Sequence, residues 1–555
     1  STLDRSSAAS DVYKRQTLDN LVYWKMVDPQ GRWKLIERVA HNFGKIHDQA
    51  LVHFRIHYLD DNGKTTIYSE ELSIPGSKFR KVGLGKDVTD KFLSGLPGIQ
   101  KEGTDGIITS AGFILHQPFS FTYTICMEFF GTVSTATPAI MEVKDFVFSH
   151  PRVELAGLEH LDWRYVRAVG YATKAARNIR PKMVLLADIA ADNQSELEEV
   201  AKHIVTFARK REGEAFIARS AAERKAFWLD RSRTAAIAKH TNAFKINEDV
   251  VIPLQHLGEY SDEIERINIE LSFANKLQLC TALTNYLSIQ LPNEPLDLDL
   301  PHQVILAKQT QRSLILINEV KARWQWMCSN LDCSLAHLKQ MYPQIMQDTE
   351  KQYPNDGTIF TAMRDFQLRI SIKRDLLEPL ASIFSSKNQS AILEKINYLH
   401  REVVRSRIFV ALHMHAGDGN IHTNIPVNSD NAQMLAVAEK IVKRIMNIVR
   451  RLNGVISGEH GIGITKIDYL TDDEMQDFWT YKKQVDPHQY FNRGKLMRGA
   501  NLNIAYTPSF HLLTEEALIL EHSNIGTIAN DVKNCLRCGK CKPVCSTHVP
   551  VSYTH

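Results

Sequence analysis

Hydrophobic and polar residues alternate along the first part of the chain, as they do in strands with one buried face. Residues 18–72 contain alternating runs such as LVHFRIHYL, separated by turn residues such as Asp61-Asn62-Gly63, and this pattern predicts strands and hairpins. Another alternating run, PKMVLLADIA, is followed by the amphipathic period of a helix over residues 194–211. Strands followed by helices predict an α+β fold.

A long helical region interrupts this alternation from residue 260 to about residue 404. Its periodic runs include IELSFANKLQLC and AKQTQRSLILINEVKARWQW, and prolines break it once between residues 292 and 301. After it, residues 407–425 return to a strand pattern, residues 432–452 predict a helix, and residues 455–466 form a glycine-rich loop. The helical region therefore reads as an insertion in an α+β domain.

Length and composition narrow the class of protein. A chain of 555 residues exceeds the roughly 250–300 residues at which a single core stops growing, so we expect several domains. Hydrophobic residues make up 44% and charged residues 23%, as in ordinary globular proteins, which argues against disorder. The formal net charge of +4 gives no electrostatic basis for wrapping nucleic acid, so no nucleic-acid partner is expected.

Neither membrane insertion nor secretion is predicted. The longest run without a charged residue, 106–127, contains His116, Gln117 and Pro118, and it alternates like strands rather than resembling a spanning helix. The N-terminus has no apolar signal segment, and the chain is too long for a small disulfide-stabilised domain. We expect a cytoplasmic protein without a membrane span. The basic helix over residues 438–452 leaves open a peripheral position at the inner face of the membrane.

Both ends of the chain have a non-native character. Residues 11–16, DVYKRQ, and residues 551–555, VSYTH, can be encoded by one DNA string and its reverse complement. Such an inverted pair is typical of a transposase adapter that was read through in DNA sequencing. We therefore leave residues 1–16 and 551–555 out of fold reasoning, and we expect this chain to be a fragment of a longer natural protein.

Four of the eight cysteines lie within eleven residues near the C-terminus. Their spacing is C-x2-C-x2-C-x3-C, which is typical of bacterial ferredoxin-type ligation of a 4Fe-4S cluster. A zinc knuckle is the alternative, although zinc ligands usually come as two separated pairs. Ser546 stands where ferredoxins have a proline, and the fourth cysteine would serve a second cluster in a two-cluster module. The predicted iron–sulfur ligands are Cys535, Cys538, Cys541 and Cys545.

Two polar motifs could carry chemistry. The first, HAGDGNIH, predicts a hairpin that brings His415 and His422 together at its mouth, although a polar turn with incidental histidines would give the same pattern. The second, SGEHGIG, places Glu459 beside His460 in a glycine-rich bend. Two histidines and one glutamate form an open three-ligand set that suits Zn²⁺ or Mn²⁺. His460 would then be a free base beside the metal.

These motifs resemble a known family. HAGDGNIH, GEHGIG followed by Lys466, and VDPHQYFNRGK resemble the C-terminal half of FAD-linked oxidases of the vanillyl-alcohol-oxidase type, among them D-lactate, glycolate and D-2-hydroxyglutarate dehydrogenases. Upstream, EGTDGIIT and the loop that begins at Lys86 resemble segments that lie against FAD in this family. The resemblance implies FAD contacts at Lys86, Gly103, Thr104, Gly106, Ile108 and Asn492.

The resemblance also implies a substrate site and a reaction. Trp228-Leu229-Asp230-Arg231 is similar to the family's W-x-x-R, whose arginine holds the substrate carboxylate, and Lys245 is similar to its second cationic anchor. Taken alone, Arg231 and Lys245 could equally belong to a solvated charged face. The implied reaction is hydride transfer from a D-2-hydroxy acid of the D-lactate or glycolate type to the flavin. His460 would take the hydroxyl proton, and the metal would be held by His415, His422 and Glu459.

Electrons would then leave through the iron–sulfur module to an acceptor such as a quinone, a cytochrome or an electron-transfer protein. Two departures from the family stand out: Arg493 replaces the proline of the family's N-P-G-K, and no pyrophosphate-binding glycine loop precedes Leu72. The residues alone also permit a His/His/Glu metallohydrolase with a zinc knuckle, or a non-catalytic electron-relay or docking subunit.

The resemblance divides the chain into domains of α+β and helical type. In order, they are the second half of a PCMH-type FAD-binding domain (17–135), the first part of a ferredoxin-like cap domain (136–259), the helical insertion (260–404), the second part of the cap with the metal site and an FAD-contacting tail (405–500), and a truncated helical ferredoxin-like 4Fe-4S segment (501–550).

Overall fold

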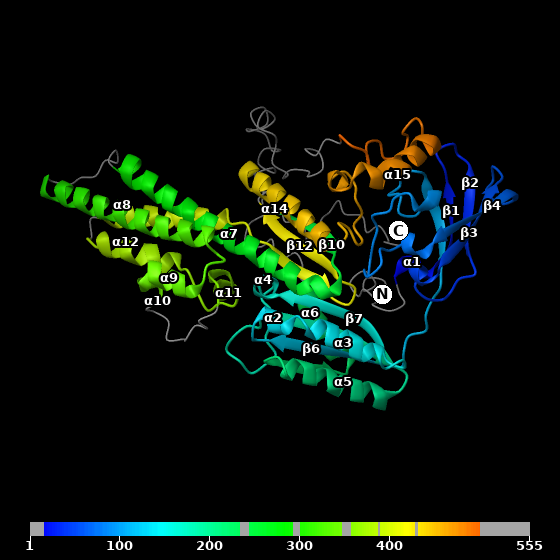
Figure 1. Ribbon diagram of the computed structural model, residues 1–555, viewed down its shortest axis with the longest axis horizontal. Coiled ribbons are helices and arrows are strands. Elements are labelled where there is room, and N and C mark those ends of the chain that lie inside the picture. The colour runs from blue at the N-terminus through cyan, green and yellow to red at the C-terminus, as the bar shows by residue number, and fades with distance from the viewer. Residues whose placement is uncertain are drawn as a thin grey trace, which may run out of the picture. The chain divides into compact units, whose positions relative to one another are not determined.

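The computed structural model describes residues 16–232, 244–291, 300–346, 357–386, 389–427 and 431–499 (Figure 1). The chain divides into two compact units. One, the sheet unit, contains the residues up to 257 together with those from 411 onward, and the other, the helical unit, contains residues 258–410. The mixture of sheets and helices confirms the predicted α+β class. The four clustered cysteines lie outside the described residues.

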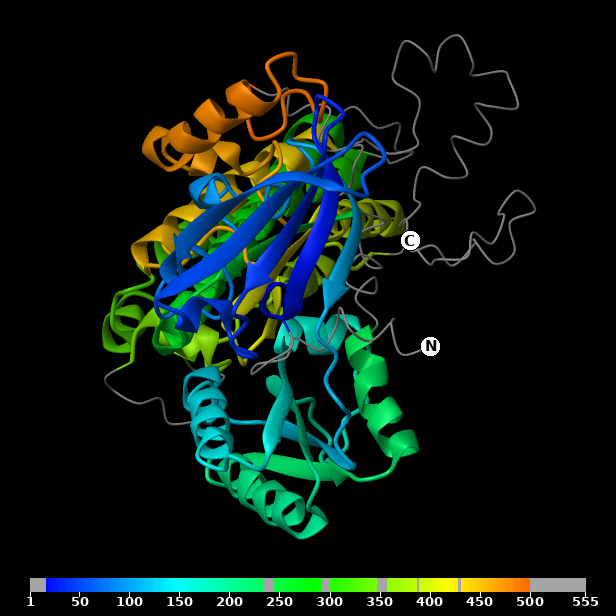
Figure 2. The same ribbon diagram turned by 90° about the vertical axis from the view of Figure 1, so that its right-hand side faces the viewer.

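The first sheet of the sheet unit has five antiparallel strands in the order β4-β3-β2-β1-β5 (Figure 2). Its core contains Trp24, Ile36 and Phe54, which are almost fully buried, and these residues sit at the apolar positions of the alternating runs. The predicted strands and hairpins over residues 18–72 are thereby confirmed. After the short helix α1 (Thr17–Asn20), the strands are β1 (Leu21–Val27), β2 (Trp33–Val39), β3 (Leu51–Leu59), β4 (Thr66–Pro75) and β5 (Ile107–Phe113).

The second sheet of the sheet unit has seven strands in the order β10-β12-β11-β7-β8-β6-β9. Its strands come from both sides of the helical unit in the sequence, because β11 and β12 follow residue 410. The boundary between the two sheets falls between β5 and β6, ahead of residue 135, where we placed the domain boundary. The strands are β6 (Phe121–Phe129), β7 (Glu154–Asp162), β8 (Met183–Ala191), β9 (Gly213–Ala218), β10 (Phe244–Val251), β11 (Ala411–His415) and β12 (Asn420–Val427).

Helices cover this second sheet. The amphipathic helix predicted over residues 194–211 is α5 (Gln194–Arg209), which buries Leu197, Val200 and Ile204 and contacts β6, β8 and β9. Asn193 begins this helix by accepting hydrogen bonds from the backbone N–H groups of the first turn. The other helices of the sheet unit are α2 (Val133–Ala136), α3 (Ala139–Phe148), α4 (Trp163–Ala168), α6 (Ala221–Ser232), α14 (Ala432–Arg451) and α15 (Asp472–Val485).

The helical unit confirms the periodic pattern of the middle of the chain. Its core includes Phe273, Trp324 and Phe384, each fully buried. Asn268 joins the two ends of the unit, because its side chain donates to the carbonyl of Val410 at 2.9 Å and accepts the N–H of Val410 at 2.8 Å. Its helices are α7 (Leu257–Asn285), α8 (Leu300–Ser329), α9 (Leu335–Met341), α10 (Pro343–Met346), α11 (Ile359–Arg364), α12 (Glu378–Ile383) and α13 (Ser390–Arg405).

Among the helices in the described part of the chain, none has both the length and the apolar composition that crossing a membrane requires.

Candidate active site

The hairpin predicted from HAGDGNIH is confirmed. Strands β11 and β12 pair with His413 opposite His422 and with His415 opposite Asn420, and the ring centroids of His415 and His422 lie 5.1 Å apart. Gly419 in the turn has a φ of +74°, and a Cβ there would lie 2.2 Å from the carbonyl oxygen of Ile252. Only glycine suits this position, because a side chain would be both strained and in collision.

Glu459 reaches the same point from the loop between α14 and α15. Its Oε1 lies 2.9 Å from Nε2 of His422 and 3.6 Å from Nε2 of His415. One ligand atom from each of the three residues falls within 4.8 Å of the others. Two imidazole nitrogens and a carboxylate oxygen at this spacing fit a divalent ion such as Zn²⁺ or Mn²⁺ and leave room for a further ligand.

Electrostatics keep the carboxylate of this ligand set charged. Burial raises the pKa of the Glu459 carboxyl, but hydrogen bonds with His415 and His422 and the charge of Lys86 outweigh it and hold the pKa far below its usual range. Burial lowers the pKa of His415, whereas the Glu159 carboxylate at 2.5 Å raises it, with a net value of about 9. The three-ligand set is therefore built around a carboxylate that stays charged.

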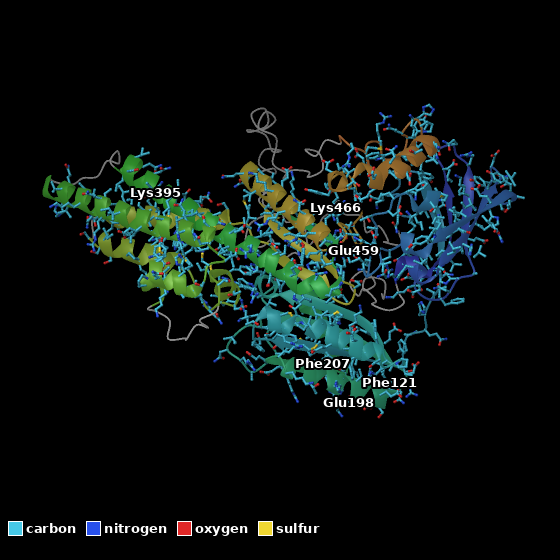
Figure 3. All side chains as sticks on the ribbon, in the orientation of Figure 1. Phe121, Glu198, Phe207, Lys395, Glu459 and Lys466 are labelled. Atoms are coloured by element: carbon cyan, nitrogen blue, oxygen red, sulfur yellow. The ribbon has the colours of Figure 1, made fainter. Side chains whose placement is uncertain are left out.

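Asp249 on β10 holds the loop that carries Glu459. Its fully buried carboxylate accepts the backbone N–H groups of Gly458, Glu459 and His460 at 2.6, 2.6 and 3.2 Å. It also pairs with the ammonium of Lys466 at 2.7 Å. Lys466 and Glu459 are both labelled in Figure 3, within the sheet unit. Burial raises the pKa of Asp249, but the charges of Lys466 and His460 and these hydrogen bonds lower it to about 2. Three consecutive amides on one carboxylate give the loop a fixed shape.

The sequence reasoning missed Asp249. The available signal was its position directly before the apolar run VVIP. A charged residue that is buried with such a run usually needs a partner of opposite charge, which here is Lys466.

His460 is the accessible imidazole of the site. Its side chain is 40% exposed, its Nε2 lies 3.8 Å from Oε1 of Glu459, and its Nδ1 lies 3.6 Å from Oδ1 of Asp249. The His460 ring centroid is 5.1 Å from that of His422. A base in this position could exchange a proton with a group bound at the open position of the metal.

Lys86 is the cation nearest to the metal ligands. Its Nζ lies 3.2 Å from Oε2 of Glu459, 3.3 Å from Oδ2 of Asp418 and 3.2 Å from Oδ1 of Asn420. Burial lowers the pKa of Lys86, but the Asp418 and Glu459 carboxylates outweigh it and raise the pKa. The loop in which we predicted a flavin contact thus reaches the metal ligands, and the flavin contact of Lys86 stays a prediction.

The other predicted flavin residues gather in one region of the sheet unit. Asn492 donates to the carbonyl oxygens of Glu102 and Gly103 at 2.9 and 3.0 Å. Thr104 is fully buried and donates to the carbonyl of Lys101 at 2.6 Å. Gly103 and Gly106 have positive φ values, and the side chain of Ile108 is exposed on β5.

This region suits a flat cofactor. Exposed apolar side chains of β5 lie next to a loop of positive-φ glycines, and a planar ring packs well on apolar surface beside open backbone. The same region is tied to the metal loop, because the Glu102 carboxylate accepts the N–H groups of Ile462 and Gly463 at 2.6 and 2.9 Å. The predicted flavin segment and the metal loop are thereby held together by direct bonds.

The side chains of some predicted site residues are not described. Arg231 falls in the last turn of α6 and Lys245 falls on β10, but their side chains are not among those described. The four predicted iron–sulfur cysteines are not described at all. The helix that carries Arg231 is anchored by Trp228, whose indole donates to the partly buried carboxylate of Asp188 at 3.2 Å.

The fold and the site define an α+β domain in which three side chains that could hold a metal ion lie close together, with the loop of Glu459 bonded to the predicted flavin segment. Residues 127–281 and 386–496 match the family described as FAD linked oxidases, C-terminal domain. These two segments of the chain therefore carry the C-terminal domain of the FAD-linked oxidases.

Several known proteins share part of this sequence. The D-2-hydroxyglutarate dehydrogenase of Xanthomonas citri pv. viticola is 36% identical over 88 residues, which is 15% of this chain and 19% of that protein. The mitochondrial D-lactate dehydrogenase [cytochrome] of Arabidopsis thaliana is 30% identical over 112 residues, 20% of each chain. Glycolate oxidase subunit GlcD of Escherichia coli K12 is 38% identical over 90 residues, 16% of this chain and 18% of that protein.

The chain thus spans about a fifth of the length of the curated relatives that it matches. Among solved structures, 4-ethylphenol oxidase from Gulosibacter chungangensis aligns with 90% of this chain and 70% of its own, at a TM-score of 0.39 and 9% identity.

Proposed function

We propose that this chain is the substrate- and metal-binding part of an FAD-dependent dehydrogenase that oxidises a D-2-hydroxy acid. The observation that carries the proposal is the convergence of His415, His422 and Glu459 with the accessible imidazole of His460. Relatives that share part of this sequence are named for the oxidation of D-2-hydroxyglutarate, D-lactate and glycolate, which supports a small 2-hydroxy acid as the substrate class.

In this mechanism the protein orients the substrate and moves one proton. Arg231 grips the substrate carboxylate with its bidentate guanidinium, and Lys245 adds a second positive charge. His415, His422 and Glu459 would hold a divalent ion, which supplies Lewis acidity to the 2-hydroxyl. His460 accepts the hydroxyl proton at Nε2 while the hydride leaves Cα.

The residues around the base support that proton transfer. Asp249 holds the backbone of His460 and lies 3.6 Å from Nδ1, which favours a proton on Nδ1 and leaves Nε2 to act as the base. Gly103, Thr104, Gly106, Ile108 and Asn492 would contact FAD, the group that supplies the hydride acceptor when bound.

The spacing of the four cysteines supports an exit route for electrons. Cys535, Cys538, Cys541 and Cys545 would hold a 4Fe-4S cluster, which accepts electrons one at a time. The final acceptor would be a quinone, a cytochrome or an electron-transfer protein.

The test is dye reduction by the full-length protein. Purified protein is mixed with D-lactate, glycolate or D-2-hydroxyglutarate and an artificial electron acceptor, with the L-enantiomers of the chiral substrates as controls. We expect reduction of the dye with at least one D-2-hydroxy acid and bleaching of the flavin absorbance by the same substrate. A colourless zinc protein that hydrolyses esters or amides would favour the metallohydrolase instead. Bound flavin that no 2-hydroxy acid reduces would favour the electron-relay subunit.

A further inference from the structure

We propose that Glu159, which has no role in the mechanism above, is a positioning residue that makes His415 the dominant ligand of the metal site. The inference rests on the metal site of the proposed function and adds an order among its ligands. Glu159 lies on β7, directly opposite His415 in the pairing of β7 with β11. The sequence did not predict this contact, because the two residues are 256 positions apart.

The contact between Glu159 and His415 is short and shielded from solvent. Oε1 of Glu159 lies 2.5 Å from Nδ1 of His415, and the exposed fractions of the two residues are 0% and 2%. A carboxylate at this distance keeps a proton on Nδ1, so Nε2, which faces Glu459 at 3.6 Å, is the nitrogen that can bind a metal once it gives up its own proton. The imidazole is therefore fixed in one orientation before any metal arrives.

The second histidine has no such support. Nδ1 of His422 is buried and has no hydrogen-bond partner within the described residues. Its ring stacks on that of His413, with centroids 4.6 Å apart and planes at 12°. The Nδ1 of His413 is itself engaged by the side chain of Asn424 at 2.9 Å. When Nε2 of His422 binds a metal, its Nδ1 must carry a proton that no described side chain accepts.

The two histidine ligands are therefore unequal. A hydrogen-bonded carboxylate raises the basicity of a ligating imidazole and restrains its ring, and loss of such a partner typically lowers metal affinity 10–100-fold. Glu159 gives this advantage to His415 alone. The metal is held mainly by His415 and Glu459, with His422 as the weaker third ligand.

The experiment measures metal affinity and needs no turnover. The full-length protein is stripped of metal with a chelator and titrated with Zn²⁺ or Mn²⁺ in competition with an indicator dye. The variant Glu159→Gln keeps the size of the side chain and removes its charge, and we expect it to bind the ion about 10–100-fold more weakly than the unchanged protein.

A matched control variant is Glu128→Gln in the same sheet. Glu128 on β6 is also fully buried, and it accepts hydrogen bonds from Tyr171 Oη and from the N–H groups of Lys174 and Ala175. The variant suffers the same kind of buried charge loss without touching a metal ligand, so its metal affinity should be unchanged.

A second variant at the same position separates loss of the contact from loss of the fold. Glu159→Asp keeps the charge but draws the carboxylate back from Nδ1, so its affinity should lie between those of the unchanged protein and Glu159→Gln. Circular dichroism establishes that each variant is folded.

The outcomes separate the claims. Equal affinity for the unchanged protein and both Glu159 variants would overturn the inference while leaving the proposed dehydrogenase intact. An equal loss in Glu128→Gln and Glu159→Gln would overturn it as well, since the loss would then follow from a general effect on the sheet. If the unchanged protein binds neither Zn²⁺ nor Mn²⁺, it has no metal site, and the inference is overturned together with that part of the proposed function.

Discussion

Replacement of Asp249 by asparagine should destabilise the loop that carries Glu459 and His460. The substitution keeps the shape of the side chain but removes a charge that pairs with Lys466 at 2.7 Å and accepts three consecutive backbone N–H groups. All three N–H groups bond to Oδ2, so the one oxygen of asparagine can still accept them, but its NH2 group would then face the Lys466 ammonium in place of Oδ1.

The magnitude follows from the burial of the pair. Both Asp249 and Lys466 are nearly inaccessible, and removal of one partner of a buried ion pair costs about 3–5 kcal/mol. Lys466 keeps a second carboxylate, Glu248, at 3.2 Å, so we expect a loss near the lower end, about 3 kcal/mol.

The free energy of unfolding at acid pH should also depend on Asp249. The folded pKa of Asp249, about 2, is below the ordinary value of 3.8, so its contribution is present above pH 3.8 and disappears as the pH falls toward 2. A shift of this size corresponds to about 2 kcal/mol. Asp249→Asn should lose this part of the pH dependence.

The assay is urea unfolding followed by circular dichroism between pH 2 and pH 7. An exposed aspartate provides the control: Asp61 lies in the turn between β3 and β4 with an exposed side chain, and Asp61→Asn should leave the transition unchanged. The double variant Asp249→Asn/Lys466→Met should recover part of the loss, because no buried charge is then left unpaired. A loss below about 1 kcal/mol in Asp249→Asn, well under the cost of breaking a buried pair, would refute this account of the loop.

Three further predictions concern the site. His460→Ala should abolish dye reduction while metal content measured by mass spectrometry stays intact, and parallel loss of both would place His460 among the ligands. His422→Ala should lose metal, because an open three-ligand site is held poorly once one ligand is gone, and full metal retention would contradict the ligand set. Arg231→Ala should raise the KM for the 2-hydroxy acid at least tenfold, as expected for loss of a bidentate clamp worth about 1.5–3 kcal/mol, and an unchanged KM would place the carboxylate elsewhere.

Local patterns in the sequence were sufficient to predict the elements that carry the site. The hairpin with His415 and His422 has strand alternation on both sides of a Gly-Asp-Gly-Asn turn, and the structure forms it in the expected place. The amphipathic helix α5 and the helices of residues 258–410 also followed their periodicity. In each case the information lies within about twenty neighbouring residues, where alternation and helical period are visible.

The contacts that complete the site depend on pairing between distant strands. Glu159 meets His415 only because β7 pairs with β11, and Asp249 meets the loop of Glu459 only because β10 pairs with β12. No local pattern marks Glu159 as buried, and only the apolar run that follows Asp249 hints at the burial of that residue, since Glu and Asp are normally exposed residues. The position of Lys86 among Asp418, Asn420 and Glu459 has the same origin, because the partners are more than 300 positions away from it in sequence.

The hydrogen bonds of Asn268 with Val410 have a consequence for the order of folding. Strands β7 and β11 must close a loop of about 250 residues before Glu159 can meet His415, and most of that loop is the helical unit. If the helical unit forms first, the hydrogen bonds of Asn268 with Val410 hold the end of the unit next to its first helix. The two ends of the unit are then separated by about three helical turns. Each halving of the remaining loop then lowers the entropic cost of strand pairing by about 0.6 kcal/mol. On the ribosome the ligands 415, 422 and 459 emerge after this unit, so the metal site is completed late, by a chain whose middle is already folded.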